Sequence, residues 1–183
     1  LRRRRQRASR SAPRLPRPVI SVGNLHWGGG GKTPLTAALC SHLLGPAEAP
    51  TGRRVCVLSR GYGRRGARRA PALVVSAGDG EGPRVAVEGA GDEPYLLARS
   101  DPRLAVVVAG DRHRGGLHAL EQLGAVDLFV LDDGFSHVAL HRDLDLLAFP
   151  WHDPLGGGRL LPTGRLREPL AAAAAADAAV LTS

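Results

Sequence analysis

The sequence predicts an α/β fold: a mostly parallel, doubly wound sheet with helices on both of its faces. Short, continuously apolar runs alternate along the chain with segments of helical periodicity, which is typical of strands buried on both faces. A chain of 183 residues that is 43% hydrophobic is long enough for one domain with a substantial core. No apolar run approaches the roughly 18 residues of a membrane span.

The first half of the chain supplies a strand, a helix and a second strand. Residues 18–23, PVISVG, form a short apolar run ending in glycine, which predicts a buried strand. Residues 33–44 carry apolar side chains at helical spacing and predict a helix. Residues 54–59, RVCVLS, predict another strand, followed by a loop rich in glycine and arginine. Cys40 and Cys56 fall in these apolar runs, so we expect buried, reduced thiols rather than a disulfide.

The second half continues the alternation. Residues 72–76 and 84–88 flank the turn-rich segment AGDGEGP, and we expect a hairpin-like addition there. Four more strands are expected, at residues 104–110, 126–133, 143–149 and 178–183. Helices are expected at residues 91–100, with a proline in the first turn, at residues 111–124 and, from a run of alanines, at residues 171–176. The last strand ends the chain, so an incomplete sheet is one expectation.

Positive charge is concentrated at the start of the chain. Residues 1–17 hold eight of the 25 basic residues and none of the 17 acidic ones, and they account for the net charge of +8. We therefore divide the chain into a basic arm, residues 1–17, and a core domain, residues 18–183. Such an arm can bind an anionic membrane surface or nucleic acid, and a solvated tail is the alternative. The sequence has no aromatic stacking surface and no known RNA-binding motif, so we expect no nucleic-acid partner.

The segment HWGGGGKTP, residues 26–34, contains the only lysine of the chain, Lys32. It follows a predicted strand and opens a predicted helix, where ligands bind in doubly wound folds. Its glycines would let backbone N–H groups wrap phosphate oxygens, Lys32 would reach the β- and γ-phosphates, and Thr33 would offer a hydroxyl to Mg²⁺. This pattern predicts a P-loop NTPase-like fold, although His26 stands where the general pattern has glycine. The cofactor-binding residues would be Gly28, Gly29, Gly30, Gly31, Lys32, Thr33 and Pro34. The alternative is a glycine-rich turn that only caps a helix.

A second acidic element would complete such a site. The apolar run VDLFVLDD ends in Asp132 and Asp133, at the edge of the sheet where the glycine loop is also expected. This is the arrangement of a Walker B strand, in which a carboxylate holds Mg²⁺ directly or through water. Two adjacent acids in a turn can also be merely solvated, and the sequence leaves open which of them contacts the metal.

Taken together, these segments resemble the tetraacyldisaccharide 4′-kinase family. The resemblance covers nearly the whole chain from about residue 10. It rests on motifs in a fixed order: PVISVGNLHWGGGGKTP, LSRGYGRR, GDEPYLLAR, VAGDRHRG, LDDGFSH, LHRDLDLL and GGGRLLPTGRLREP. Several short motifs in one order are far more specific than a P-loop alone. The chain departs from the family pattern at His26, Trp27 and Gly30, and at Ser136, where glutamine is usual.

The resemblance implies an ATP- and Mg²⁺-dependent kinase that phosphorylates the 4′-hydroxyl of a tetraacylated glucosamine disaccharide 1-phosphate in lipid A biosynthesis. It also implies a location at the cytoplasmic face of the bacterial inner membrane. We infer no obligate protein partner from the sequence. Family members carry a hydrophobic N-terminal segment and a smaller C-terminal domain, and this chain is expected to lack both. We therefore expect this piece alone to bind MgATP but to transfer phosphate weakly or not at all.

The resemblance also implies roles for individual residues. Asp92, in GDEP, would be the general base that accepts the proton of the sugar hydroxyl, with Lys32 also catalytic. Glu168, in LREP, would join Thr33, Asp132 and Asp133 at the metal. Further candidates for contact with substrate are Glu93, Arg60, Arg112, Arg167 and His137, with Tyr62 beside Arg60. As an alternative, Asp92 and Glu93 could serve only to start a helix, since its dipole favours acids there.

Two other classes of function remain to be separated from the kinase. A P-loop ATPase or GTPase of the metallochaperone or partitioning type would share Lys32, Thr33 and Asp132, but it has no need for GDEP or GRLLPTGRLREP. A nucleic-acid-binding module led by the arginine arm is the third possibility. ATP consumption with and without the lipid disaccharide, compared with the same assay on RNA, distinguishes the three.

Overall fold

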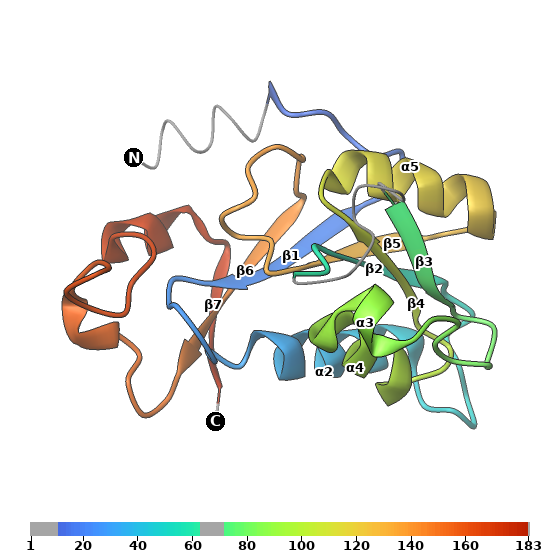
Figure 1. The fold of residues 1–183 in the computed structure, drawn as a ribbon, viewed down its shortest axis with the longest axis horizontal. Coiled ribbons are helices and arrows are strands. Elements are labelled where there is room, and N and C mark those ends of the chain that lie inside the picture. Colours follow the sequence, from blue (N-terminus) through green and yellow to red (C-terminus); the bar gives the residue numbers. More distant parts are fainter. Residues whose placement is uncertain (1–10, 63–71, 183) are drawn as a thin grey trace.

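The computed structural model describes residues 11–62 and 72–182, and its central feature is one seven-stranded sheet (Figure 1). The order of strands is β3-β4-β2-β5-β1-β6-β7. The strands are β1 (Val19–Asn24), β2 (Val55–Ser59), β3 (Ala72–Ala77), β4 (Ala105–Ala109), β5 (Leu128–Asp132), β6 (Leu144–Pro150) and β7 (Ala178–Thr182). Every neighbouring pair is parallel except β3 with β4. The predicted mostly parallel α/β sheet is therefore confirmed.

Helices cover both faces of this sheet (Figure 1). On one face lie α2 (Lys32–Leu44), α3 (Val87–Ala90) and α4 (Asp92–Ser100), and on the other lies α5 (Arg112–Leu123). Strand β2 shows why both faces are covered, because its side chains point alternately toward the two layers of helices. Val55 and Val57 pack into the core under α2 and α4, whereas Cys56 and Leu58 pack into the core under α5. Both faces are thus apolar, as the continuous hydrophobic runs predict.

The register of the central strands determines where the site forms. Strand β1 lies between β5 and β6 and is parallel to both. Val22 of β1 is paired with Asp132, the last residue of β5. The loop that follows β1 therefore begins beside the end of β5, at the carboxyl edge of the sheet, where ligands bind in open α/β folds.

The segment between β6 and β7 packs around a third, smaller core. This core consists of Leu25, Phe135, Leu147, Leu166 and Ala172. The segment includes two short 3₁₀ helices, Gly156–Gly158 and Leu170–Ala175. The helix predicted from the alanine run is thus present, in the tighter 3₁₀ form. Because Leu25 lies just before the glycine loop, the start of that loop is anchored in this third core.

The predicted hairpin between residues 72–76 and 84–88 is wrong. Strand β3 pairs antiparallel with β4 instead, and residues 87–90 form the short helix α3. The two segments share one isolated bridge, between Ser76 and Pro83, and the N–H of Arg84 donates to the carbonyl of Val75. Proline has no N–H to extend a ladder, and the apolar edge of β4 offers β3 a more extensive partner.

The part of the basic arm that the structure describes lies against the core domain. Leu15 is buried in the core under α5, where its side chain fills the space above Gly116. The N–H of His141 donates to the carbonyl of Pro13 at 3.0 Å. Residues 1–10 lie outside the described ranges, and the boundary at residue 17 stays a prediction. Within the described ranges, no helix is long and apolar enough to cross a membrane.

Cys40 and Cys56 are both free and buried. Burial raises the pKa of the Cys40 thiol to about 12, and the charge of Asp132 acts in the same direction. The prediction of reduced thiols is confirmed, and such a thiol is a poor nucleophile because its thiolate is not populated at neutral pH.

Candidate active site

The loop after β1 has a backbone that suits phosphate binding. Gly28 and Gly31 have φ angles of 90° and 70°, in the left-handed region that side chains disfavour. A Cβ atom at Gly30 would collide with the side chain of Asn24, whereas Gly28 and Gly29 face open space. Glycine is therefore needed in this loop both for its backbone conformation and for close packing, and part of the loop stays open to a ligand.

The same loop leads directly into helix α2. Lys32, Thr33 and Pro34 form its first turn, and no side chain caps that turn. Proline is favourable here because its missing N–H would have had no partner within the helix. The N-terminal end of a 13-residue helix carries partial positive charge, which favours an anion at this position.

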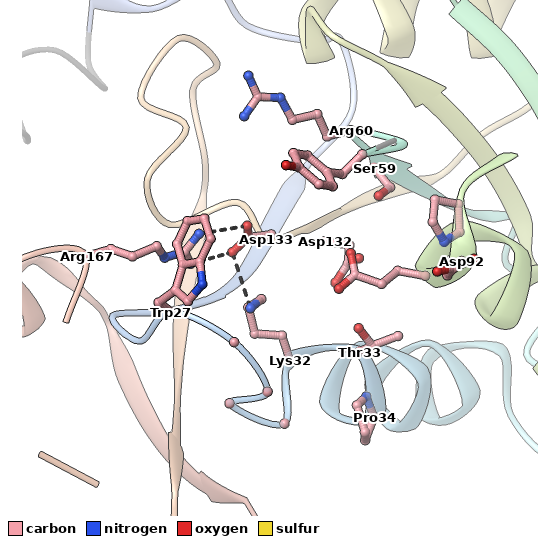
Figure 2. A pocket seen from close by; sticks show the side chains of 17 residues that line it. Trp27, Lys32, Thr33, Pro34, Ser59, Arg60, Asp92, Asp132, Asp133 and Arg167 are labelled. Carbon is pink, nitrogen blue, oxygen red and sulfur yellow. Dashed lines mark hydrogen bonds and ion pairs between the residues drawn. The ribbon is translucent and has the colours of Figure 1, made fainter. Parts of the chain in front are cut away.

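Asp133 lies at the centre of a charged cluster. Its carboxylate accepts hydrogen bonds from Arg167 at 3.0 and 2.7 Å, and it lies 3.7 Å from Nζ of Lys32 (Figure 2). Arg167 also donates to Oδ1 of Asn24 at 2.7 Å. Burial disfavours the charged form of Asp133, but Arg167 and Lys32 outweigh this effect, and its pKa is lowered from the usual range. Asp133 therefore holds both cations at the mouth of the glycine loop.

Asp132 has a different environment from its neighbour. Its carboxylate is 1% exposed; Oδ1 accepts a hydrogen bond from Thr36 at 3.2 Å, and Oδ2 has no hydrogen-bond partner. Burial raises the pKa of Asp132 to about 6, and the charges of Glu93 and Asp133 add to the effect. A buried carboxylate oxygen without a partner, in a cavity that Thr33 also lines, fits a divalent cation.

One cavity of about 550 Å³ brings most of the predicted site residues together (Figure 2). This volume is in the usual range for small-molecule sites. Asp92 and Glu93 reach the cavity from the first turn of α4. The predicted residues that line it are Gly28, Gly29, Gly30, Gly31, Lys32, Thr33, Pro34, Arg60, Tyr62, Asp92, Glu93, Asp132, Asp133 and Arg167.

Three predicted residues do not line this cavity. Arg112 is 3% exposed and donates to the carbonyls of Ala109 and Gly110, and burial, followed by the charge of Arg60, lowers its pKa to about 10. Burial, reinforced by Arg112, lowers the pKa of His137 to about 4, so the ring is neutral at pH 7. The carboxylate of Glu168 accepts a hydrogen bond from Ser136 at 2.6 Å. Their roles stay predictions.

The structure adds residues to which the sequence gave no role at the site. Ser59, at the end of β2, and Trp27 both line the cavity, and Asn24 supports it through Arg167. The signal for Ser59 is its place at the carboxyl end of a buried strand, which is where ligand-binding residues gather in this architecture. In the described ranges no group of three or more His, Cys, Asp or Glu side chains is arranged to hold a metal, so a cation here would depend on Thr33, Asp132 and oxygens of its ligand.

A glycine loop between β1 and α2, with a buried aspartate at the end of the adjacent β5, defines a P-loop nucleotide-binding fold. The particular family follows from comparison of sequences. The family model described as tetraacyldisaccharide-1-P 4′-kinase matches residues 1–183. The chain belongs to this family, which favours the kinase over the ATPase or GTPase alternative.

Individual relatives agree with this assignment. The chain is 49% identical over 168 residues to the tetraacyldisaccharide 4′-kinase of Geobacter sulfurreducens, covering 92% of this chain and 45% of the relative. It is 51% identical over 169 residues to the enzyme of the same name from Pelobacter propionicus, covering 92% of this chain and 44% of that one. The chain thus spans about half the length of the curated relatives it matches.

A crystal structure of LpxK from Aquifex aeolicus, described as a complex with ATP, has the same fold. The two structures superpose with a TM-score of 0.82 at 45% sequence identity, and the match covers 98% of this chain and 53% of the other. This similarity confirms the P-loop kinase fold.

Proposed function

We propose that this protein is an ATP-dependent kinase that phosphorylates the 4′-hydroxyl of a tetraacylated glucosamine disaccharide 1-phosphate in lipid A biosynthesis. The observation that carries the proposal is one cavity that is lined on one side by phosphate-binding groups and on another by two acids. The glycine loop and Lys32 form one wall, and Asp92 and Glu93 at the start of α4 form another. An ATPase that drives a conformational change needs the first wall, whereas a kinase needs both.

The glycine loop binds the phosphates of ATP. Backbone N–H groups from Gly28 to Thr33 wrap the phosphate oxygens, and the end of helix α2 favours their charge. Nζ of Lys32, now 3.7 Å from Asp133, moves to the β- and γ-phosphates when nucleotide binds. Asp133, which Arg167 orients, holds the lysine near this position in the meantime, which reduces the side-chain entropy lost on binding.

Asp132 and Thr33 hold Mg²⁺ together with oxygens of the nucleotide. The fit rests on the buried Oδ2 of Asp132, which has no partner within the protein. Held by these residues, Mg²⁺ would supply positive charge that stabilises the negative charge developing on the transferred phosphoryl group. Asp133 and Glu168 would act near the metal rather than as its ligands, because Asp133 pairs with Arg167 and Lys32 and Glu168 accepts a hydrogen bond from Ser136.

Phosphoryl transfer requires a base on the acceptor side. The 4′-oxygen of the sugar bonds to the γ-phosphorus, the bond from that phosphorus to the bridging oxygen breaks, and ADP leaves. Asp92 accepts the proton that the hydroxyl loses. Arg167 supplies positive charge for the phosphates, and Glu93 and Arg60, which line the same cavity, help to position the acceptor. Arg112 and His137, which do not line the cavity, are given no direct contact with either substrate.

Product analysis tests this function directly. Full-length protein is incubated with MgATP and the tetraacyl disaccharide 1-phosphate, and we expect an acceptor with one additional phosphate and an equal amount of ADP. ATP hydrolysis of the same rate without acceptor, and no phosphorylated lipid, would favour the ATPase alternative instead.

The buried carboxylate of Asp132 should make the stability of the protein depend on pH. Its pKa is raised, so between about pH 4 and 6 the folded protein keeps a proton that the unfolded chain has released. The free energy of unfolding therefore falls as the pH rises through that window. Asp132→Asn cannot ionise, so the variant should not show this fall. We expect the variant without ligand to be more stable than the wild type by about 1–3 kcal/mol at pH 8 and equally stable at pH 4.

Thermal unfolding at both pH values measures this difference. The same variant should lose the stabilisation that Mg²⁺ adds to ATP, because its amide is a poor ligand for the cation. Glu121→Gln, which removes an exposed acid on α5, is the control and should change neither quantity. A variant less stable than the wild type at pH 8 would contradict the buried-charge account.

We also propose that the basic arm binds the anionic inner surface of the inner membrane, where the acylated substrate resides. Residues 1–10 contain six arginines and no acid. Each arginine held near an anionic surface contributes about 1 kcal/mol at low salt, less after screening.

Vesicle co-sedimentation tests the arm. We expect full-length protein to bind vesicles containing phosphatidylglycerol far better than neutral ones, and substitution of the six arginines of residues 1–10 by glutamine to remove most of the difference. Equal binding to both kinds of vesicle, or tighter binding to RNA than to lipid, would overturn this proposal.

A further inference from the structure

Trp27 is an exposed aromatic residue inside a polar, charged cavity. Its side chain is 63% exposed although it lines the cavity together with Lys32, Asp133 and Arg167. Figure 2 shows its indole ring on the Arg167 side of the cavity, across from Asp92. A large aromatic ring at such a place provides a flat apolar surface to a ligand.

The backbone around Trp27 is fixed in place. Its N–H donates to the carbonyl of Arg165 at 2.7 Å, and the N–H of Arg167 donates to the carbonyl of Leu25 at 2.7 Å. Between them, His26 and Leu166 form an antiparallel bridge. Two buried leucines of the third core, Leu25 and Leu166, lie on this short ladder. Trp27 therefore projects from a rigid base that also holds Arg167, and its ring can be presented without a large ordering cost.

The position of Trp27 in the loop indicates which ligand it meets. The lysine that reaches the β- and γ-phosphates stands at the helix end of a P-loop. Trp27 lies at the opposite end, beside the Asp133–Arg167 pair and on the far side of the cavity from Asp92. An acceptor that reaches both Asp92 and a phosphate held by Lys32 occupies this cavity, and Trp27 lines the side opposite Asp92. A charged phosphate group is not stabilised by contact with an indole face, whereas the apolar C–H face of a pyranose ring packs favourably against it.

We propose that Trp27 forms a wall of the acceptor subsite, on which the pyranose ring that carries the reacting hydroxyl packs. This inference rests on the proposed function and adds a specificity-determining residue to it. The apolar face of the sugar covers the indole, while its hydroxyls point to the polar groups that line the rest of the cavity. A stacking contact of this kind positions the acceptor without changing the affinity for ATP.

Steady-state kinetics of the full-length enzyme test the proposal. We expect Trp27→Ala to raise KM for the disaccharide about tenfold, with KM for ATP within about twofold, and Trp27→Phe to recover most of the loss because a ring is retained. Trp151→Ala removes the other tryptophan of this chain, which is 71% exposed and does not line the cavity, and it should change neither KM.

A binding measurement provides a second readout. In protein labelled with 5-fluorotryptophan, the ¹⁹F resonance absent from Trp27→Phe belongs to Trp27. Addition of disaccharide 1-phosphate without ATP should shift that resonance, and ATP alone should shift it much less.

Three outcomes would overturn the inference in different ways. An unchanged KM for the disaccharide in Trp27→Ala, in an active enzyme, would reject Trp27 while leaving the kinase function intact. A rise in KM for ATP alone, with the ¹⁹F shift caused by ATP, would make Trp27 a nucleotide contact. A wild-type protein that phosphorylates no disaccharide would reject the proposed function and this inference with it.

Discussion

Replacement of Lys32 by alanine is expected to reduce phosphoryl transfer by about 10³-fold, the scale on which a single preorganised charge contributes to such reactions. The lysine is the only one in the chain, and it begins helix α2 beside the glycine loop. Without Lys32, no ammonium group stabilises the negative charge of the γ-phosphoryl group in the transition state. Affinity for ATP should also fall, as measured by calorimetry.

Lys32→Arg provides the more informative comparison. It keeps the charge but replaces a flexible point charge with a planar fork, and we expect it to fail nearly as badly. Arg53→Ala, which removes an exposed cation distant in sequence from the loop, is the control and should leave transfer unchanged. Wild-type turnover in Lys32→Ala would reject the P-loop assignment, and full activity in Lys32→Arg would show that charge alone suffices.

Replacement of Asp92 by asparagine is expected to lower kcat by about 10²-fold or more, with little change in affinity for ATP. Asp92 is exposed, lies in the first turn of α4, and lines the cavity. The residue that precedes the helix is Gly91, so no side chain caps α4. Asparagine keeps the shape of the side chain and removes the base.

The competing explanation is that Asp92 only stabilises the start of the helix. It predicts a lower melting temperature and a nearly unchanged kcat, since acids at helix starts contribute about 0.3–1 kcal/mol. Glu88→Gln, which removes an exposed acid from the first turn of α3, is the matched control for that effect. Thermal unfolding and single-turnover kinetics on both variants decide between the explanations.

Patterns that involve backbone and burial could be predicted well from the sequence. The strands β1, β2, β4, β5 and β6 are largely apolar runs. Such runs are typical of a sheet whose two faces are both covered by helices. The wrong prediction of a hairpin between residues 72–76 and 84–88 also follows from burial and strand pairing. Residues 84–88 alternate like a strand, but the choice of partner for β3 depended on the edge of β4, which lies more than 25 residues further along the chain.

The positions of site residues could be predicted where they follow a strand end or a helix start. Lys32, Asp92 and Asp132 all meet in one cavity for that reason. The direction of a long side chain could not be predicted in this way. Arg112 begins α5 as expected, yet its guanidinium turns back to the carbonyls of Ala109 and Gly110. Trp27 was visible only as a departure from the family pattern, because periodicity says nothing about exposed residues in loops.

The third core has a consequence for how the molecule unfolds. The glycine loop is anchored at one end by Leu25 in this small core, and at the other by helix α2, which packs into the large core beneath the sheet. Small cores open locally at a lower free energy than large ones, so the two ends of the loop belong to separate cooperative units. A ligand held by both ends can bind tightly only when both units are folded. Nucleotide therefore acts as a thermodynamic cross-link, and its binding should slow amide hydrogen exchange around Leu166 and Ala172 as well as along helix α2.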